Sequence, residues 1–125
     1  MTYLDTHVVA YLYAGQFDLL SEHARLEIEA NTLRISPMVI LELEFLREIG
    51  RISEGGEPIV NDLEMRINLR VCEIPFTSVV RQGLQEIWTR DPFDRLIVAQ
   101  ARLGNASNLL TKDRSIRQNC SFASW

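Results

Sequence analysis

No apolar run in this 125-residue chain reaches the 18 or so residues that a membrane-spanning helix needs. The first residues, MTYLDTHVVAYLYAG, lack a basic leader and hold Asp5 inside an apolar stretch, unlike a secretory signal. The two cysteines, Cys72 and Cys120, are too few for a disulfide framework and lack the spacing of a metal site. We therefore expect a cytoplasmic protein with no membrane segment, whose cysteines pack in its interior.

Lysine is nearly missing as well, since arginine makes up 12 of the 13 basic residues. The net charge of −4 gives no general attraction for nucleic acid, so binding a polyanion would require a local positive feature. Glycine and proline are also few, six and four residues, while 46% of the chain is hydrophobic. This composition is typical of an ordinary globular protein, and the length predicts one domain over residues 1–125.

Short β-like runs alternate with amphipathic segments along the chain. The expected strands cover residues 2–5, 70–76, 107–111 and 121–125, and residues 31–36 are expected to form a turn and then a strand that ends at Ser36. The expected helices cover residues 7–13, 19–30, 37–49, 59–69, 78–88 and 91–104, with Pro58 opening the fourth. Such alternation predicts an α/β fold, a parallel sheet of about five strands with helices on both faces. Sites in these folds lie outside the carboxyl ends of the strands.

Two aspartates fall at that rim of the predicted sheet. Asp5 closes the first strand, where a carboxylate needs solvent, a cation or hydrogen-bond donors. Asp113 follows the strand 107–111, although it could also simply cap a short helix that begins with RSIRQN. We interpret Asp5 as a functional acid and leave both interpretations of Asp113 open.

A third acid, Glu42, stands out by helical periodicity. At about 100° per residue it shares a face with Met38, Phe45 and Ile49, which predicts that it interrupts a core-facing stripe. A buried carboxylate must be paired, protonated or bound to metal. A salt bridge to an arginine such as Arg95 or Arg114 is the alternative interpretation. On the opposite side, Ile40 and Leu43 either contact a partner or lie buried under the preceding helix.

The stretch RDPFDRLIVAQA holds two further aspartates at the start of a largely apolar helix. Asp91 followed by Pro92 is a typical N-cap, and capping is enough to explain it. Asp94 lies three residues later, where it could complete a capping-box-like pair, although Glu or Gln is the usual residue there. Because the rest of this helix is apolar on most sides, we expect it to hold Asp94 rigidly at the rim of the sheet.

Four acids from separate segments can thus meet at one edge of the sheet: Asp5, Glu42, Asp94 and Asp113. Their mutual repulsion would be severe without a cation. Oxygen ligands without a His or Cys cluster favour Mg²⁺ or Mn²⁺. Such an ion suits phosphoryl transfer, because it can activate water and neutralise phosphate charge. Arg95 and Arg114, the arginines nearest to these acids in the sequence, are candidates for contact with phosphate.

The segments YLDTHVVAYLY, SPMVILELEFL, RDPFDRLIVAQA and LLTKD, in this order, resemble the PIN domain, above all the VapC-like toxins of bacterial toxin–antitoxin pairs. The resemblance covers nearly the whole chain. It implies a three-layer α/β/α fold and a Mg²⁺- or Mn²⁺-dependent endoribonuclease that forms a homodimer and is neutralised by an antitoxin protein. It also implies that Asp5 and Asp94 are the principal metal ligands, with Glu42 and Asp113 completing the acid cluster and Thr6 assisting.

Arg90 departs from this resemblance, because many members of the family have His at its position. The role of Arg90 is left open. A different class of function also stays open: a non-catalytic signalling or RNA- or protein-binding α/β domain that uses the acidic rim only to bind a cation. A phospho-acceptor module would need an acid after the third strand, where this chain has IPFTS. The hypothesis that we carry forward is metal-dependent hydrolysis of RNA.

Overall fold

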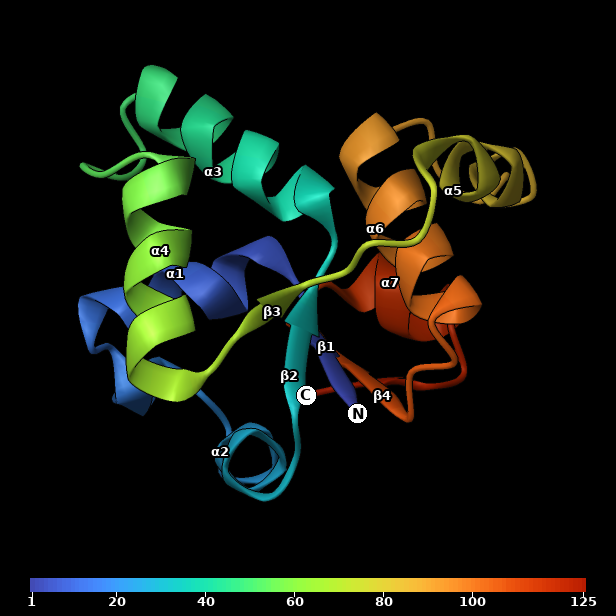
Figure 1. Ribbon diagram of the computed structural model, residues 1–125. Helices are drawn as coiled ribbons and strands as arrows, with labels where there is room; N and C mark the ends of the chain where they lie inside the picture. The colour runs from blue at the N-terminus through green and yellow to red at the C-terminus, as the bar shows by residue number, and fades with distance from the viewer.

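The computed structural model describes residues 1–125 and shows a five-stranded sheet between two groups of helices (Figure 1). The strands are β1 (Thr2–Leu4), β2 (Leu33–Ile35), β3 (Arg70–Val71), β4 (Asn108–Leu110) and β5 (Ala123–Ser124). They lie in the order β3-β2-β1-β4-β5, and each neighbouring pair is parallel. The predicted α/β fold with a five-stranded parallel sheet is confirmed.

Seven α-helices surround this sheet. They are α1 (Thr6–Ala14), α2 (Glu22–Ala30), α3 (Pro37–Glu48), α4 (Gly56–Ile67), α5 (Phe76–Gly83), α6 (Pro92–Leu103) and α7 (Arg114–Asn119), with one turn of 3-10 helix at Phe17–Leu19. In Figure 1, α1 and α4 lie on one side of the sheet and α6 and α7 on the other. None of these helices has the length and apolar character that crossing a bilayer requires.

The starts of α3 and α6 follow from local sequence. Ser36 accepts a hydrogen bond from the backbone N–H of Met38, and Pro37 occupies the first helical turn. Asp91 caps α6 in the same way ahead of Pro92. These hydrogen bonds confirm both predicted N-caps. Proline fits the first turn because its missing N–H needs no partner there and its φ already has a helical value.

The interior of the fold lies around the central strand β1 and its neighbour β4. Every residue of β1 and β4 is buried, and Leu4, Leu109 and Leu110 are fully so. Cys72 and Cys120 are buried free thiols, as expected. The Tyr3 hydroxyl donates a hydrogen bond to the Cys72 sulfur at 3.1 Å, which satisfies that hydroxyl group in the core.

The position of β1 in the middle of the sheet determines where a site can form. The chain passes from β1 to β2 on one side, and β4 lies on the other side. The ladder between β1 and β4 continues past their ends, because the Asp5 N–H donates to the Leu110 carbonyl at 3.0 Å. In parallel sheets, the crevice at such a reversal of strand order lies outside the carboxyl ends and is the usual ligand site.

The predicted core-facing side of α3 is wrong. The buried residues are Val39, Leu43 and Leu46. Phe45 and Ile49, which were expected to face the core beside Glu42, are 43% and 49% exposed. The helix carries apolar residues on almost every side, so periodicity alone could not select the buried face.

The expectation for Ile40 and Leu43 therefore also changes. Leu43 is fully buried, which removes it as a surface contact. Ile40 is half-buried, and its backbone carbonyl closely approaches Gly56 at the start of α4. The helix that covers this side of α3 is thus α4, and not the preceding α2.

Several helices and strands begin or end at residues other than those predicted. The strand expected over 70–76 is only two residues long, because the chain turns into α5 at Phe76. This helix ends at Gly83, five residues before its expected end. The helix expected over 19–30 begins at Glu22, after the N-cap Ser21. Pro58 is the third residue of α4, which begins at Gly56.

Candidate active site

A cavity of about 410 Å³ opens beyond the carboxyl ends of β1 and β4. Eight residues line it: Asp5, His7, Tyr11, Glu42, Asp91, Asp94, Lys112 and Asp113. Five of the eight carry carboxyl groups, and the four acids predicted to meet are all among them. Segments separated by up to about a hundred residues therefore contribute negative side chains to one hollow.

Asp5 is held rigidly at the back of this cavity. It is 6% exposed, and its backbone position is the N-cap of α1. One carboxylate oxygen, Oδ1, accepts from the Thr6 N–H at 2.8 Å, and Oδ2 accepts from the Thr111 hydroxyl at 2.5 Å. Burial raises the pKa of Asp5 above its usual range, although both hydrogen bonds favour the ionised form.

Thr111 joins two of the acids. Its hydroxyl oxygen accepts from the Asp113 backbone N–H at 3.0 Å, while its proton is donated to Asp5. The accepted hydrogen bond fixes the direction of the hydroxyl, so the proton remains aimed at the Asp5 carboxylate. Thr111 was not among the predicted site residues, because an uncharged side chain at the end of a strand carries no recognisable signal in the sequence.

Glu42 reaches the cavity from α3. Its Oε1 accepts a hydrogen bond from the hydroxyl of Thr6, which is itself fully buried. Burial raises the pKa of Glu42 to about 7, against the lowering effect of the Thr6 hydrogen bond, and the charges of Asp5 and Asp91 add to the rise. The alternative of a salt bridge to Arg95 or Arg114 is not found, since neither arginine pairs with Glu42.

Asp94 lines the cavity from the first turn of α6, and its side-chain carboxylate accepts no hydrogen bond. Burial is the main cause that raises the pKa of Asp94 to about 7, followed by repulsion from Asp91 and Asp5. Asp91 alone caps the helix, because its Oδ1 accepts from the N–H groups of Phe93 and Asp94 at 2.8 and 3.3 Å. The capping-box interpretation of Asp94 is therefore wrong, and its carboxylate is left free in the cavity.

Asp113 caps a helix, as one interpretation of the sequence predicted, and it also lies at the cavity. Its Oδ1 accepts from the Ile116 N–H at 2.9 Å, which caps α7. The same side chain lines the acidic cavity, and its charge raises the pKa of Asp5, Glu42 and Asp94. Capping fixes the carboxylate in place without removing its charge.

The basic residues near these acids differ from those predicted. Arg95 and Arg114 do not line the cavity. The Arg95 Nε donates instead to the Thr89 carbonyl at 2.9 Å, and Arg114 is exposed at the start of α7. Lys112 and His7 are the basic side chains that do line it. This hydrogen bond to Thr89, which precedes α6, explains why the Arg95 side chain does not reach the cavity.

The potential ligand atoms of this cavity are of the kind that hard divalent cations prefer. The cavity offers carboxylate oxygens without a thiolate, and no arginine neutralises any of the five acids. However, no group of three or more His, Cys, Asp or Glu side chains is placed as a ligand set. The residues therefore fit an ion that is held through one or two carboxylates and keeps several waters, which is the usual behaviour of Mg²⁺.

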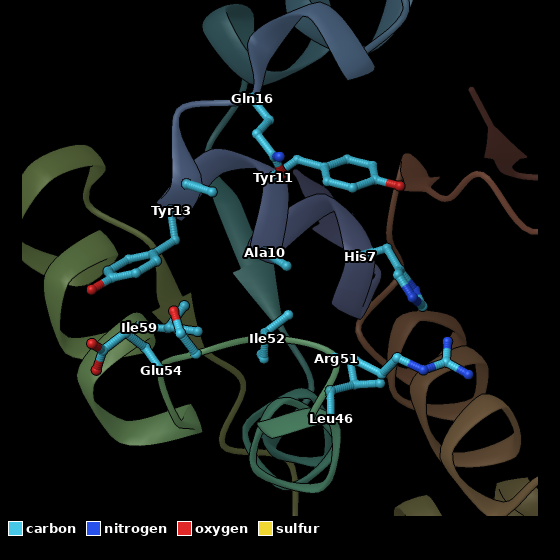
Figure 2. Close-up of a pocket in the computed structure, with 12 residues that line it drawn as sticks. His7, Ala10, Tyr11, Tyr13, Gln16, Leu46, Arg51, Ile52, Glu54 and Ile59 are labelled. Carbon is cyan, nitrogen blue, oxygen red and sulfur yellow. The ribbon is translucent and has the colours of Figure 1, made fainter. Parts of the chain in front are cut away.

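A second cavity, of about 610 Å³, adjoins the first and shares His7 and Tyr11 with it. Figure 2 shows it between α1 and the segment around Ile52, with Ala10 and Ile52 facing each other across it. His7 and Tyr11 project on one side of α1, away from Tyr13. The acidic hollow thus continues into a more apolar groove along α1.

Comparison with known proteins identifies the family. The family model of the PIN domain matches residues 2–120. PIN domains are generally nucleases, which hydrolyse phosphodiester bonds with divalent metal ions. Among curated proteins, no sequence matches this chain.

Solved structures also share the fold, among them the following two. One is a chain in the crystal structure of VapBC2 from Rickettsia felis bound to a DNA fragment from their promoter, with a TM-score of 0.68 and 20% identity over 99% of this chain and 98% of that one. The other belongs to a toxin–antitoxin complex from Klebsiella pneumoniae, with a TM-score of 0.67 and 14% identity over 100% and 97%. With a family model that matches almost its entire length, this chain belongs to the PIN domain family.

Proposed function

We propose that this protein is a Mg²⁺- or Mn²⁺-dependent endoribonuclease that acts as the toxin of a toxin–antitoxin pair. The observation that carries the proposal is the cavity at the strand ends, where Asp5, Glu42, Asp94 and Asp113 come together without an ion-pair partner. Membership of a family of nucleases supports hydrolysis of a phosphodiester. The two structures of similar fold come from toxin–antitoxin complexes, which supports an antitoxin as partner.

In this proposal Asp5 and Asp94 hold the ion, and Glu42 and Asp113 complete its surroundings. A bound divalent ion would activate water and neutralise charge on the phosphate. Asp5 suits the role because two hydrogen bonds fix its orientation before any ligand arrives. Asp94 suits it because its oxygens have no other partner and its repulsion with Asp91 would be relieved by a cation.

Glu42 is the candidate proton acceptor. Its Oε1 is occupied by the Thr6 hydroxyl, which leaves Oε2 to receive a proton from the attacking water. A pKa of about 7 lets this carboxyl exchange protons near neutral pH. Thr6 thereby acts as a positioning residue that fixes the rotamer of Glu42.

An RNA-cleavage assay tests the nuclease proposal. We predict that the Asp94→Asn variant and a chelator such as EDTA each reduce cleavage of single-stranded RNA by at least about a hundredfold, because the first removes a ligand of the ion and the second removes the ion that would activate the attacking water. Asp18→Asn is the matched control, since Asp18 is exposed in the 3-10 turn and lies outside the cavity. Undiminished cleavage by the variant and in chelator would reject the assignment.

A non-catalytic domain that binds a cation or RNA is the second candidate. The absence of any three side chains placed as metal ligands favours it. The same assay separates the two proposals: a protein that binds RNA in the presence of Mg²⁺ or Mn²⁺ but never cuts it is a binding domain. Metal-dependent cleavage that is lost in Asp94→Asn is expected only of the nuclease.

We also propose that two copies of the chain associate. Large apolar side chains are exposed on α3 and in and after α5, and this set is called the α3–α5 surface: Leu41, Phe45, Ile49, Phe76, Leu84 and Ile87. Both helices pack against α6 and lie on the upper side of the molecule in Figure 1. Apolar exposure of this kind is typical of a contact surface, and a second copy would cover it.

A further inference from the structure

The only lysine of the chain lies at the acidic cavity. All 12 other cationic side chains are arginines, and none of them lines this hollow. Lys112 comes directly after Thr111, which hydrogen-bonds Asp5, and directly before Asp113, which caps α7. Its own backbone carbonyl accepts from the Arg117 guanidinium at 3.2 Å. The backbone of Lys112 is therefore fixed from both sides.

The ammonium group of Lys112 has no anionic partner, even beside five carboxyl groups. The three ion pairs of the protein are Arg47–Glu44, Arg66–Asp62 and Arg102–Glu86. The contact that the Lys112 Nζ does make is with the ring of Tyr11, whose centroid lies 5.9 Å away. At an exposed position this cation–π contact is weak, so it can orient the ammonium group and still release it to a stronger partner.

A polyanion that approaches this cavity meets an electrostatic obstacle. The net charge of the chain is −4, and five of the eight lining residues are acids. An RNA phosphate at this rim therefore needs a positive group in addition to any ion held by the carboxylates. Lysine is suited to this task, because its ammonium is a compact point charge that can donate to one phosphate oxygen from a flexible stem.

We propose that Lys112 binds a non-bridging oxygen of an RNA phosphate at the rim of the acidic cavity, with Tyr11 holding its ammonium group in position. This inference rests on the proposed ribonuclease function and deepens it, since it assigns the phosphate contact to this residue. An acidic group of a protein partner would compete for the same ammonium, and the experiment below includes that outcome. Figure 2 places Tyr11 beside His7 on the side of α1 that the two cavities share.

The single lysine makes a direct test possible. N-acetoxysuccinimide can acetylate two amines in this chain, the side chain of Lys112 and the α-amine of Met1. The Met1 amine donates to the Ser107 hydroxyl at 3.1 Å, at the amino end of β1 and away from the cavity. It therefore serves as an internal control. We use the Asp94→Asn variant so that the RNA stays intact, and we follow both amines by peptide mass.

We expect a single-stranded RNA oligonucleotide to slow acetylation of Lys112 at least fivefold and to leave the Met1 rate unchanged. RNA binding is measured in parallel by fluorescence anisotropy. Bound RNA without protection of Lys112 would overturn this inference and leave the nuclease proposal standing. If neither this variant nor the unaltered protein in EDTA binds RNA, both the inference and the nuclease proposal are rejected. Protection by a poly-glutamate peptide but not by RNA would assign Lys112 to a protein partner and also overturn the inference.

Substitution gives an independent measurement. Lys112→Gln should weaken RNA binding about ten- to a hundredfold, because one charge-assisted hydrogen bond is lost. It should also reduce the slope of log K against log salt by about one, which a merely structural residue would not change. Arg25→Gln on α2 is the charge-matched control, because Arg25 is exposed and lies outside the cavity. An equal loss in both variants would contradict the assignment.

Discussion

At the scale of single residues, the site depends on how each carboxylate is oriented before a ligand binds. Asp5 and Asp113 are fixed by backbone N–H groups, and Glu42 by a hydroxyl. Asp94 has no such partner and can move most freely toward a cation. Of the four acids predicted to form the site, three therefore have carboxylates held by hydrogen bonds, and the carboxylate of Asp94 can change its orientation.

The sequence predicted Asp5 and Asp113 from the ends of strands, Asp94 from the start of a helix and Glu42 from the periodicity of its helix. It did not predict Thr111, whose role comes from a hydrogen bond to a residue 106 positions away. Lys112 carried a signal that could have been used, as it is the only lysine of the chain. Arg95 was predicted near the acids, but the Thr89 carbonyl holds its side chain.

The raised pKa values of Glu42 and Asp94 predict how stability depends on pH. Both are about 7 in the folded protein, against about 4 in an unfolded chain. The folded state therefore keeps protons that the unfolded state releases, so stability falls as pH rises from about 4 to 7. In chelator, we predict a lower melting temperature at pH 8 than at pH 5, with about 1–2 kcal/mol from Asp94 after allowance for solvent screening.

Asp94→Asn is the informative variant for this prediction. An amide cannot ionise, so the decrease between pH 5 and pH 8 should be smaller than in the unaltered protein. Added Mg²⁺ should raise the melting temperature of the unaltered protein at pH 8 more than that of the variant. Thermal unfolding followed by circular dichroism measures both effects. The same pH slope in both proteins would show that Asp94 does not retain its proton on folding.

At the scale of secondary-structure elements, the sequence was most informative where a side chain caps a helix. Asp91 and Ser36 marked the starts of α6 and α3 correctly, because capping is a local interaction. It was least informative for the buried face of α3, which is selected by contact with α4. The length of β3 was overestimated, since the strand ends at Val71 and the chain turns into α5.

The packing of α3 on α4 depends on a close approach at Gly56. A Cβ atom added there would collide with the backbone carbonyl of Ile40, which cannot move aside. We predict that Gly56→Ala lowers the free energy of unfolding by about 1–3 kcal/mol, the usual cost of overpacking. Urea denaturation measures this change.

Gly55→Ala is the matched control on the neighbouring residue. A Cβ at Gly55 would meet the Glu44 carboxylate, which is the far end of a flexible side chain and can rotate away. The expected loss is at most about 1 kcal/mol, because Glu44 would give up its hydrogen bond to the Gly56 N–H. Equal losses in the two variants would contradict the idea that the backbone contact limits the approach of these helices.

At the scale of the whole molecule, the α3–α5 surface predicts a dimer. Leu84 and Ile87 are 62% and 71% exposed, so replacing them with glutamate removes little buried area within one copy. We expect the unaltered protein to sediment as a dimer and Leu84→Glu/Ile87→Glu to sediment as a monomer, because two charges in an apolar contact are costly to desolvate. Analytical ultracentrifugation at several concentrations measures the mass.

Met65→Glu provides the control for this prediction. Met65 is 88% exposed on α4 and lies outside the α3–α5 surface. Its replacement should leave the sedimenting mass unchanged. A monomeric unaltered protein, or a dimer that survives the double substitution, would show that this surface does not join two copies.

The shortness of the strands has a consequence for how the molecule opens. The inner strands β1, β2 and β4 have three residues each, and the edge strands β3 and β5 have two. Amide protons of the edge strands should exchange with deuterated water first, and those of β1 and β4 last. Asp5 and Thr111 adjoin these slowest strands, so their carboxylate and hydroxyl remain aligned even while the margins of the protein transiently unfold.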